Sequence, residues 1–502
     1  MGVYAAQPGD FQAWVDQNLA YLLERFPNYP KQVFEPQRGP DSCRHYPRAF
    51  MGEYLRTRFQ MAVHQAKRLN LTVARYPRHE IIDVKRSGRV VRLTANCDNL
   101  QGSLVYESDA VLLATGHWVA EDHRENYFDS PWPAARLLSE IPAGATVAVI
   151  GTSLSAIETA LTLTSDGRFS ASHSGELQYI PSGRPRRVYL YSRRGLLPKV
   201  RGKVGAYENQ YLTPAAFESR QSPDLARVSL ERVFELLNQE LEAAYGRPID
   251  WEAVLSPGQD PQTVLAHSLR EAVTGDEPGG TVIWQTVLRQ IFPYIRDWYA
   301  HLAPVDRVRF DQEFTSVFFM HVATQPHINA AKLLALMKAG LVHVVRLGPR
   351  YRFYHDESSS AYRFDYTDAR GQPTSDGFPF VVNARGQNAA MATDRSQLAQ
   401  NLIRAGYVRS GGMAEAPEDL VPKSEAASAR AKESRAHLSG TLRIDPATGR
   451  VRSLSSKQSI YGAVYAVGAM TRGQIIDASM AHSLCRSTDA ISKELLDALL
   501  RG

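Results

Sequence analysis

A short apolar run that is followed at once by a glycine and a helical pattern constrains this chain more than any other feature. Residues 146–150 read Thr-Val-Ala-Val-Ile, and the next residues, Gly151-Thr-Ser-Leu-Ser-Ala-Ile-Glu, continue with helical spacing. This pattern is typical of a buried parallel strand that turns tightly into a helix. A second β pattern at residues 187–192 begins about 36 residues after Gly151. The spacing predicts a β-α-β unit with a long loop.

The turn itself has the residues that a dinucleotide requires. Free N–H groups at the start of such a helix favour a phosphate. Gly151 would permit the sharp turn, and Ser153 stands where a second glycine would allow close approach to a pyrophosphate. Ala156 would keep the helix near the sheet, while Ser153 and Ser155 could each add a hydroxyl donor. We therefore expect Gly151, Thr152, Ser153, Ser155 and Ala156 to bind a dinucleotide; the alternative is a serine-capped helix packed on a sheet without a ligand.

Two arginines at the end of the second β pattern indicate which dinucleotide it would be. Arg193 and Arg194 stand where such a fold meets the adenosine ribose. An acidic residue there would bind a 2′-hydroxyl, whereas arginine accepts a 2′-phosphate. The pair favours NADPH over NADH, unless both side chains merely solvate a strand end. Lys199 and Arg201 could add positive charge at the same rim.

Composition excludes several other classes. Lys+Arg number 58 and Asp+Glu 52 in 502 residues, so a net charge of +6 is weak support for nucleic-acid binding. There is no apolar stretch of about 18 residues and no secretion-signal pattern. The three cysteines have no metal-like spacing, as in a reducing cytoplasm. Common hydrolase and NTPase motifs are absent. We expect a cytoplasmic protein that contacts neither nucleic acid nor membrane and holds no metal.

The remaining periodicity gives the organisation. Helices are expected at 11–26, 54–69, 225–245, 282–302 and 328–337, and β alternation runs from 71 to 116. The helical patterns between about 205 and 340 form an insertion in an α/β chain. Residues 380–384, Phe-Val-Val-Asn-Ala, suit another buried strand, and a polar stretch at about 411–439 suits a linker.

Several segments together resemble a known group. They are Tyr46–Tyr54, Leu113–His117, Val464–Gly473 and, most specifically, Ser192-Arg-Arg-Gly-Leu-Leu-Pro198. Their order is similar to that in two-dinucleotide flavoproteins related to flavin-containing and N-hydroxylating monooxygenases. More narrowly, the chain resembles the FAD/NAD(P)-binding family that has the Ser-Arg-Arg-Gly-Leu-Leu-Pro segment after its second Rossmann strand. The resemblance extends over nearly the whole chain.

The resemblance implies two Rossmann-like domains with FAD and NADPH as cofactors. The FAD-type domain would comprise residues 1–118 and 345–502, and the NADPH domain residues 119–344 with the insertion. Thr115 and Gly116 would form the crossover between the domains, and Gly468, with a helix that starts near Ile475, would lie beside FAD. Arg48 and Gly52 would belong to the FAD-side wall. His117 could orient nicotinamide or donate a proton near the flavin.

One departure from that family is the missing first fingerprint. Its members open with a strand, a Gly-x-Gly-x-x-Gly turn and a helix that holds the FAD pyrophosphate, and this chain has no such sequence. A start assigned too late, a fragment, a partner or second copy that supplies the missing half, or loss of FAD binding would each explain it. The FAD-type domain is therefore expected to be incomplete.

These features predict an FAD- and NADPH-dependent oxidoreductase that acts on a small molecule, either a monooxygenase or a reductase. Since the cofactors supply the redox chemistry, no protein nucleophile is required. His321 and His327 lack metal-ligand partners in the sequence and suit core or helix-start positions. The alternative function is a non-catalytic NADPH-binding or interaction protein.

Overall fold

A five-stranded, all-parallel sheet is the centre of the computed structural model, which confirms the α/β class. The structure describes residues 3, 7, 9–27, 45–87, 90–98, 102–117, 124–173, 175–218, 229–255, 259–276, 280–386, 391, 394–408, 442–452, 464–472 and 474–500. The sheet order is β10-β9-β6-β14-β5. Its strands are β5 (Tyr127–Phe128), β6 (Thr146–Ile150), β9 (Arg187–Ser192), β10 (Val342–Arg346) and β14 (Phe380–Asn383).

The expected strand–turn–helix is present at the middle of this sheet. Strand β6 pairs with β9 on one side, from Thr146↔Arg187 to Ile150↔Tyr191, and with β14 on the other, from Phe380↔Val147 to Asn383↔Ile150. Helix α4 (Leu154–Leu163) follows β6. Strand β14 lies beyond residue 344, so the sheet continues past the boundary that the sequence suggested.

The two faces of the sheet are covered differently. Helices pack on one face through buried aliphatic side chains; they are α3 (Ala134–Glu140), α4, α8 (Pro261–Thr274) and α13 (His327–Lys338). An antiparallel sheet covers the other face with aromatic side chains; its strands are β11 (Tyr351–Asp356), β12 (Ala361–Thr367) and β13 (Pro373–Phe378). The rings of Tyr191 and Phe364 stack at 4.2 Å between centroids. The hydroxyl of Tyr191 donates to Asp376 at 2.7 Å, and burial raises the pKa of this tyrosine. Both faces are thus dry, as a parallel sheet requires.

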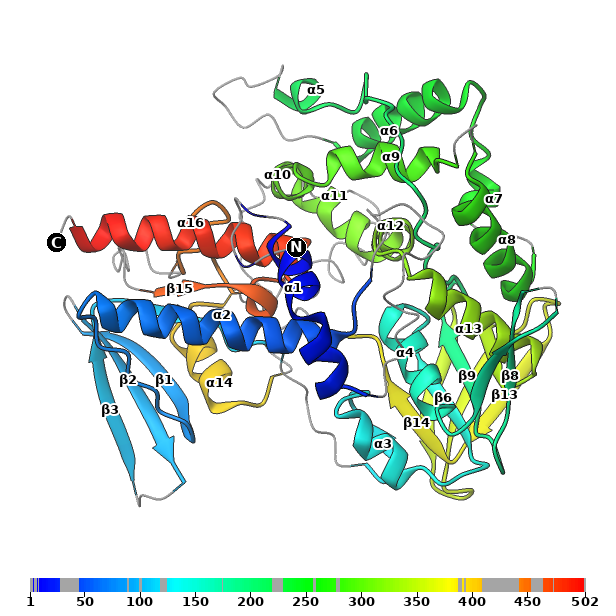
Figure 1. The fold of residues 1–502 in the computed structure, drawn as a ribbon, viewed down its shortest axis with the longest axis horizontal. Coiled ribbons are helices and arrows are strands. Elements are labelled where there is room, and N and C mark those ends of the chain that lie inside the picture. The colour runs from blue at the N-terminus through cyan, green and yellow to red at the C-terminus, as the bar shows by residue number, and fades with distance from the viewer. Residues whose placement is uncertain are drawn as a thin grey trace, which may run out of the picture.

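The helical insertion lies between β9 and β10 and occupies the top and right of Figure 1. The helix expected over 282–302 is two helices, α9 (Ile283–Ile291) and α10 (Ile295–His301), because Pro293 cannot continue the hydrogen-bond ladder. The other helices here are α5 (Pro214–Glu218), α6 (Leu230–Tyr245), α7 (Trp251–Leu255), α11 (Pro304–Arg309), the π-helix η3 (Phe310–Phe314) and α12 (Thr315–Val322). Between β6 and β9 there is also a hairpin, β7 (Arg168–Ala171) and β8 (Leu177–Ile180).

The N-terminal part is a helix pair beside a β meander (Figure 1). Helix α1 (Asp10–Arg25) packs against α2 (Arg48–Arg68) through Phe11, Trp14 and Tyr54. The meander consists of β1 (His79–Ser87), β2 (Val90–Cys97) and β3 (Ser103–Ser108). Helix α2 begins six residues before the expected Tyr54, directly after Pro47, whose fixed φ suits the position before a first helical turn.

The C-terminal part returns to the N-terminal part. Strand β15 (Val464–Ala466) pairs in parallel with β4 (Val111–Leu113), and α14 (Gln397–Arg404) packs on β1. The helix expected from Ile475 was placed wrongly: α16 spans Ala481–Leu500, and 476–479 form turns. The side chain of Asp477, which accepts a hydrogen bond from Ser483 at 2.8 Å, holds these turns against the first turn of α16. The linker expected at 411–439 lies outside the described residues.

In the part of the chain that the structure describes, no helix is long and apolar enough to span a membrane. The described His, Cys, Asp and Glu residues include no group of three or more that could hold a metal ion.

Candidate functional site at the carboxyl edge of the parallel sheet

The turn after β6 can be made only by glycine. Gly151 has φ +126°, and a Cβ atom there would lie 3.1 Å from the carbonyl oxygen of Ala384, at the end of the neighbouring strand. Its N–H donates to Tyr191 O at 2.7 Å. A substituted residue would be strained in backbone and would press on a neighbouring main chain. The turn therefore fixes the spacing of three strand ends.

The residues after Gly151 have different surroundings. Ser153 is the N-cap residue of α4, and its side chain makes no capping hydrogen bond. Ala156 is fully buried where α4 contacts the sheet. Thr152 is also buried, and its hydroxyl donates to Leu196 O at 2.6 Å. Thr152 thus joins this turn to the loop after β9, while Ser153 and Ser155 remain half-exposed or exposed at the helix start.

The topology places this turn at a switch point of the sheet. After β6 the chain continues to β9 on one side, whereas β14 and β5 lie on the other. Open α/β sheets bind ligands in the crevice outside the carboxyl ends of the strands, where the order reverses. Gly151 and Ala384 stand on the two sides of this point. Exposed Arg385 follows Ala384, and its Nε donates to Asn383 Oδ1 at 3.1 Å. The sequence analysis did not predict residues 383–385 as site residues, although the sequence shows a basic residue, Arg385, directly after a buried strand.

The two arginines after β9 turn toward the insertion. Arg194 Nη2 donates to Glu313 O at 2.8 Å, and Arg193 Nη2 lies 3.5 Å from Gln312 O; both acceptors belong to η3. Lys199 and Arg201 lie on the next segment, whose backbone bonds to Met320 O and Gln325 O. The insertion therefore lies directly over the β9 end of the crevice.

A second parallel edge lies at the ends of β4 and β15. Val467 N donates to Leu113 O at 3.0 Å, so the residues that come after both strands leave the same edge. Thr115, Gly116 and His117 are exposed there, with Gly116 at φ +74°. Gly468 has φ +78° and begins the 3-10 helix η6 (Gly468–Thr471).

Arg48 connects the N-terminal part to α4. As the first residue of α2, it makes bidentate hydrogen bonds to Glu158 on α4, with Nη2 at 2.8 Å from Oε1 and 3.0 Å from Oε2. Gly52 is exposed, with open space around it. Arg48 is therefore held at the α4 helix.

His321 has the surroundings of a core histidine. Its Nδ1 lies 2.9 Å from Val317 O, and its ring meets Trp284 edge-on at 4.9 Å. Burial lowers the pKa of His321 to about 4, so the ring is neutral at neutral pH. His327 begins α13, and burial lowers its pKa as well.

One segment of the chain matches a known protein family. Residues 1–118 match a family described as FAD-NAD(P)-binding. The match confirms the resemblance to FAD/NAD(P)-binding flavoproteins that the sequence motifs suggested.

Two curated relatives extend beyond this segment. An uncharacterized protein, YdhS, from Escherichia coli (strain K12) is 26% identical over 357 residues, 65% of this chain and 65% of that protein. An L-aspartate N-monooxygenase (nitrosuccinate-forming) from Streptomyces davaonensis is 29% identical over 274 residues, 48% of this chain and 41% of that protein. The aligned regions thus cover less than two thirds of either relative. Among solved structures, L-lysine 6-monooxygenase from Pseudomonas syringae is 14% identical with a TM-score of 0.41, covering 84% of this chain and 71% of that one.

The β6 edge fits NADP(H) better than the β4–β15 edge fits FAD. At the β6 edge, the strand, the glycine that admits no Cβ and the uncapped helix start form a cradle that fits the pyrophosphate of NADP(H). At the β4–β15 edge, the described residues offer two strand ends and the positive-φ glycines 116 and 468. The part of the chain that the structure describes has no glycine turn leading directly from β4 or β15 into an α-helix. This edge therefore fits only part of FAD, and we derive no step through the flavin.

Proposed function

We propose that this protein is an NADPH- and FAD-dependent oxidoreductase of the cytoplasm that acts on a small molecule. The observation that carries the proposal is the Gly151 turn at the switch point of the parallel sheet. The family match of residues 1–118 supports the flavin half of the proposal. FAD, when bound, would supply the redox chemistry.

The chain's own residues have separate roles in this proposal. The N–H groups at the start of α4, with Ser153 and Ser155, bind the pyrophosphate, and Gly151 gives it room. Arg193 and Arg194 exchange their carbonyl partners in η3 for the 2′-phosphate, because a charged acceptor makes stronger hydrogen bonds than a neutral one. Gly468, Thr115 and Gly116 border the flavin, and His117 orients the nicotinamide or supplies a proton. Arg48, ion-paired with Glu158, belongs to the same wall.

The sheet topology favours a revised division of the chain. We assign the described residues of 124–384 to the NADPH domain, since β5 and β14 lie in its sheet. The FAD-type domain would consist of residues 1–118 and the described residues from 391 onward.

Absorbance at the flavin bands tests the proposal. Purified chain is titrated with FAD, and NADPH is then added without oxygen. A stoichiometric flavin spectrum that bleaches with NADPH supports the oxidoreductase. NADPH binding by a folded chain without flavin uptake would instead support the second candidate, a non-catalytic NADPH-binding protein or one that needs a partner, which the incomplete β4–β15 edge favours.

A monooxygenase is the more specific form of the proposal. L-Aspartate is the first substrate to test, because one relative is named for it. Faster NADPH consumption with an N-oxygenated product indicates a monooxygenase. Consumption that yields only peroxide or a reduced acceptor indicates a reductase.

A further inference from the structure

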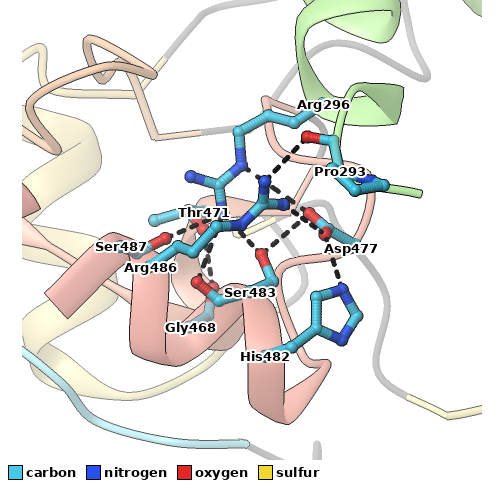
Figure 2. Close-up of polar contacts among 9 residues, drawn as sticks. All are labelled: Pro293, Arg296, Gly468, Thr471, Asp477, His482, Ser483, Arg486 and Ser487. Carbon is cyan, nitrogen blue, oxygen red and sulfur yellow. Dashed lines mark hydrogen bonds and ion pairs between the residues drawn. The ribbon is translucent and has the colours of Figure 1, made fainter. Parts of the chain in front are cut away.

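A polar cluster joins the insertion to the C-terminal part, at a place that neither edge of the candidate site includes. Figure 2 shows Arg296 of α10 and Arg486 of α16 converging on Asp477 and Ser483, beside the Gly468–Thr471 segment. Only 2% of the Asp477 side chain is exposed, and Arg296 is 13% exposed. Burying charges at this depth is unfavourable unless their hydrogen-bonding groups are satisfied.

Some of the hydrogen bonds in the cluster are well made. Arg296 Nη2 donates to the hydroxyl groups of Ser483 and Ser487, the latter at 2.9 Å. Arg486 Nη1 donates to Pro293 O at 2.7 Å. These contacts hold both guanidinium groups in fixed orientations and join α10 to the first turns of α16.

Three further nitrogen atoms of the two guanidinium groups make no hydrogen bond. Arg296 Nε, Arg486 Nε and Arg486 Nη2 are buried without a hydrogen bond. Asp477 does not satisfy them: its oxygens lie 3.7 Å from Arg296 Nε and 3.6 Å from Arg486 Nη2, too far for hydrogen bonds. His482 Nε2, at 3.4 Å from Asp477 Oδ2, is also unbonded. Asp477 Oδ2 is likewise buried without a hydrogen bond, and native proteins rarely leave such groups unpaired.

A cavity of about 410 Å³ lies against the same two arginines. Its wall also contains two carboxylates, Asp297 and Asp445. Asp445 is already used, because it accepts hydrogen bonds from Ala447 N and from Arg452. Asp297 attracts the positive charge of the neighbouring Arg296. The volume suits a small molecule.

We propose that Arg296 and Arg486 form a binding site for a small oxyanion, a carboxylate or a phosphate group. Two guanidinium groups are suited to an oxyanion because each can give it charge-assisted, directional hydrogen bonds. The cavity would place an oxyanion against both guanidinium groups. Because the Gly468–Thr471 segment is adjacent, an occupant would connect the insertion with the edge proposed for the flavin. The proposal rests on these contacts and not on the proposed redox function.

Calorimetric titration with sodium malonate and sodium phosphate, at constant ionic strength, tests the site. The wild-type chain is expected to bind at least one probe, and Arg486→Gln to weaken it at least tenfold, while Arg232→Gln, at an exposed arginine paired with Glu235, leaves it unchanged. Displacement of the probe by ADP indicates a nucleotide phosphate as the natural group, and no displacement indicates a free small oxyanion. Both outcomes support the site.

Two results would overturn the proposal: no binding of either probe by the wild-type chain, or equal binding by wild type and Arg486→Gln. Ordered water would then be the partner of the unpaired donors. Since loss of Arg486 leaves Asp477 with one partner fewer, the double variant Arg486→Gln, Asp477→Asn keeps the net charge of the cluster unchanged and safeguards folding. NADPH affinity, measured in parallel, separates this outcome from failure of the proposed function.

Discussion

The two parallel edges of this molecule differ in the element that comes directly after their strands. At the first edge, β6 passes through Gly151 directly into α4, and β9 and β14 flank it on both sides. At the second edge, β4 and β15 form a two-stranded sheet, β15 also makes an antiparallel bridge to Arg450, and a 3-10 helix comes after β15. Both edges have positive-φ glycines. The edges therefore differ not in their glycines but in the helix that starts directly after Gly151, an arrangement that favours a phosphate.

Gly151→Val is expected to have the largest effect. The φ of +126° and the Ala384 oxygen at 3.1 Å oppose any side chain, so the free energy of unfolding should fall by about 4 kcal/mol and NADPH affinity at least 100-fold. Gly468→Val meets only the flexible Leu484 side chain at 3.4 Å and should cost about 1–2 kcal/mol, with NADPH affinity kept.

Urea unfolding and NADPH titration measure both changes. Gly377→Val, in a strand with only an ordinary contact to Arg363, is the matched control. Equal losses of NADPH affinity in the two test variants would remove the distinction between the edges.

The pH dependence of stability should reveal how the insertion holds the first edge. Burial lowers the pKa of His321 to about 4, below the value of about 6.5 expected in the unfolded chain. The folded state favours the neutral ring, so His321 contributes stability above pH 6.5 that is lost as the pH falls toward 4. The loss should be about 3 kcal/mol, because each unit of pKa difference corresponds to about 1.4 kcal/mol.

Denaturant midpoints at pH 7, 5.5 and 4.5, compared with those of His321→Gln, test this expectation. The variant should show a flatter profile. His64→Gln, on the exposed outer face of α2, serves as control. Identical profiles for wild type and His321→Gln would mean that His321 is not buried in a neutral form.

The preference for NADPH over NADH tests the role of the two arginines after β9 at the first edge. Reversing both charges in Arg193→Glu, Arg194→Glu should move the preference for NADPH over NADH by about 1–3 kcal/mol toward NADH. Arg187→Glu, at the opposite end of β9, should leave the ratio of the two dissociation constants unchanged. An unchanged ratio in the double variant would identify the two arginines as structural partners of η3 alone.

The smallest expected effect concerns the contact between the N-terminal part and α4. Arg48 is 73% exposed and Glu158 24% exposed, so their coupling should amount to only about 0.5–1 kcal/mol in a double-mutant cycle of Arg48→Ala and Glu158→Gln. Urea unfolding in low and high salt measures it. A coupling near zero would mean that this ion pair does not contribute to stability.

Local patterns predicted the first edge well. Residues 146–163 contain the apolar run, the glycine and the helical period in one continuous segment, so the strand, the turn and the helix could all be recognised. The order of the sheet was not accessible in the same way. The strand at 380–383 was recognised as buried, but its place beside β6 depends on pairing across more than two hundred residues.

The arginine cluster has no local signal in the sequence. Arg296 and Arg486 come from helices that are remote along the chain, and Asp477 lies in turns that the helical pattern after Ile475 concealed. Likewise, the sequence predicts Thr152 as a cofactor-binding residue but gives no sign that its hydroxyl joins two loops. In both cases the partner, not the residue type, decides the role, and only the folded chain supplies the partner.

The insertion enters and leaves the sheet domain at neighbouring points. The segments around Val200 and Gln325 run side by side as a parallel bridge, and α13 then leads into β10. A parallel strand pair needs only one crossover helix, and α13 already provides it. Apart from α8, which packs on the sheet, the residues between these two points are not needed to connect the strands, so this lobe could change in length without altering the strand order.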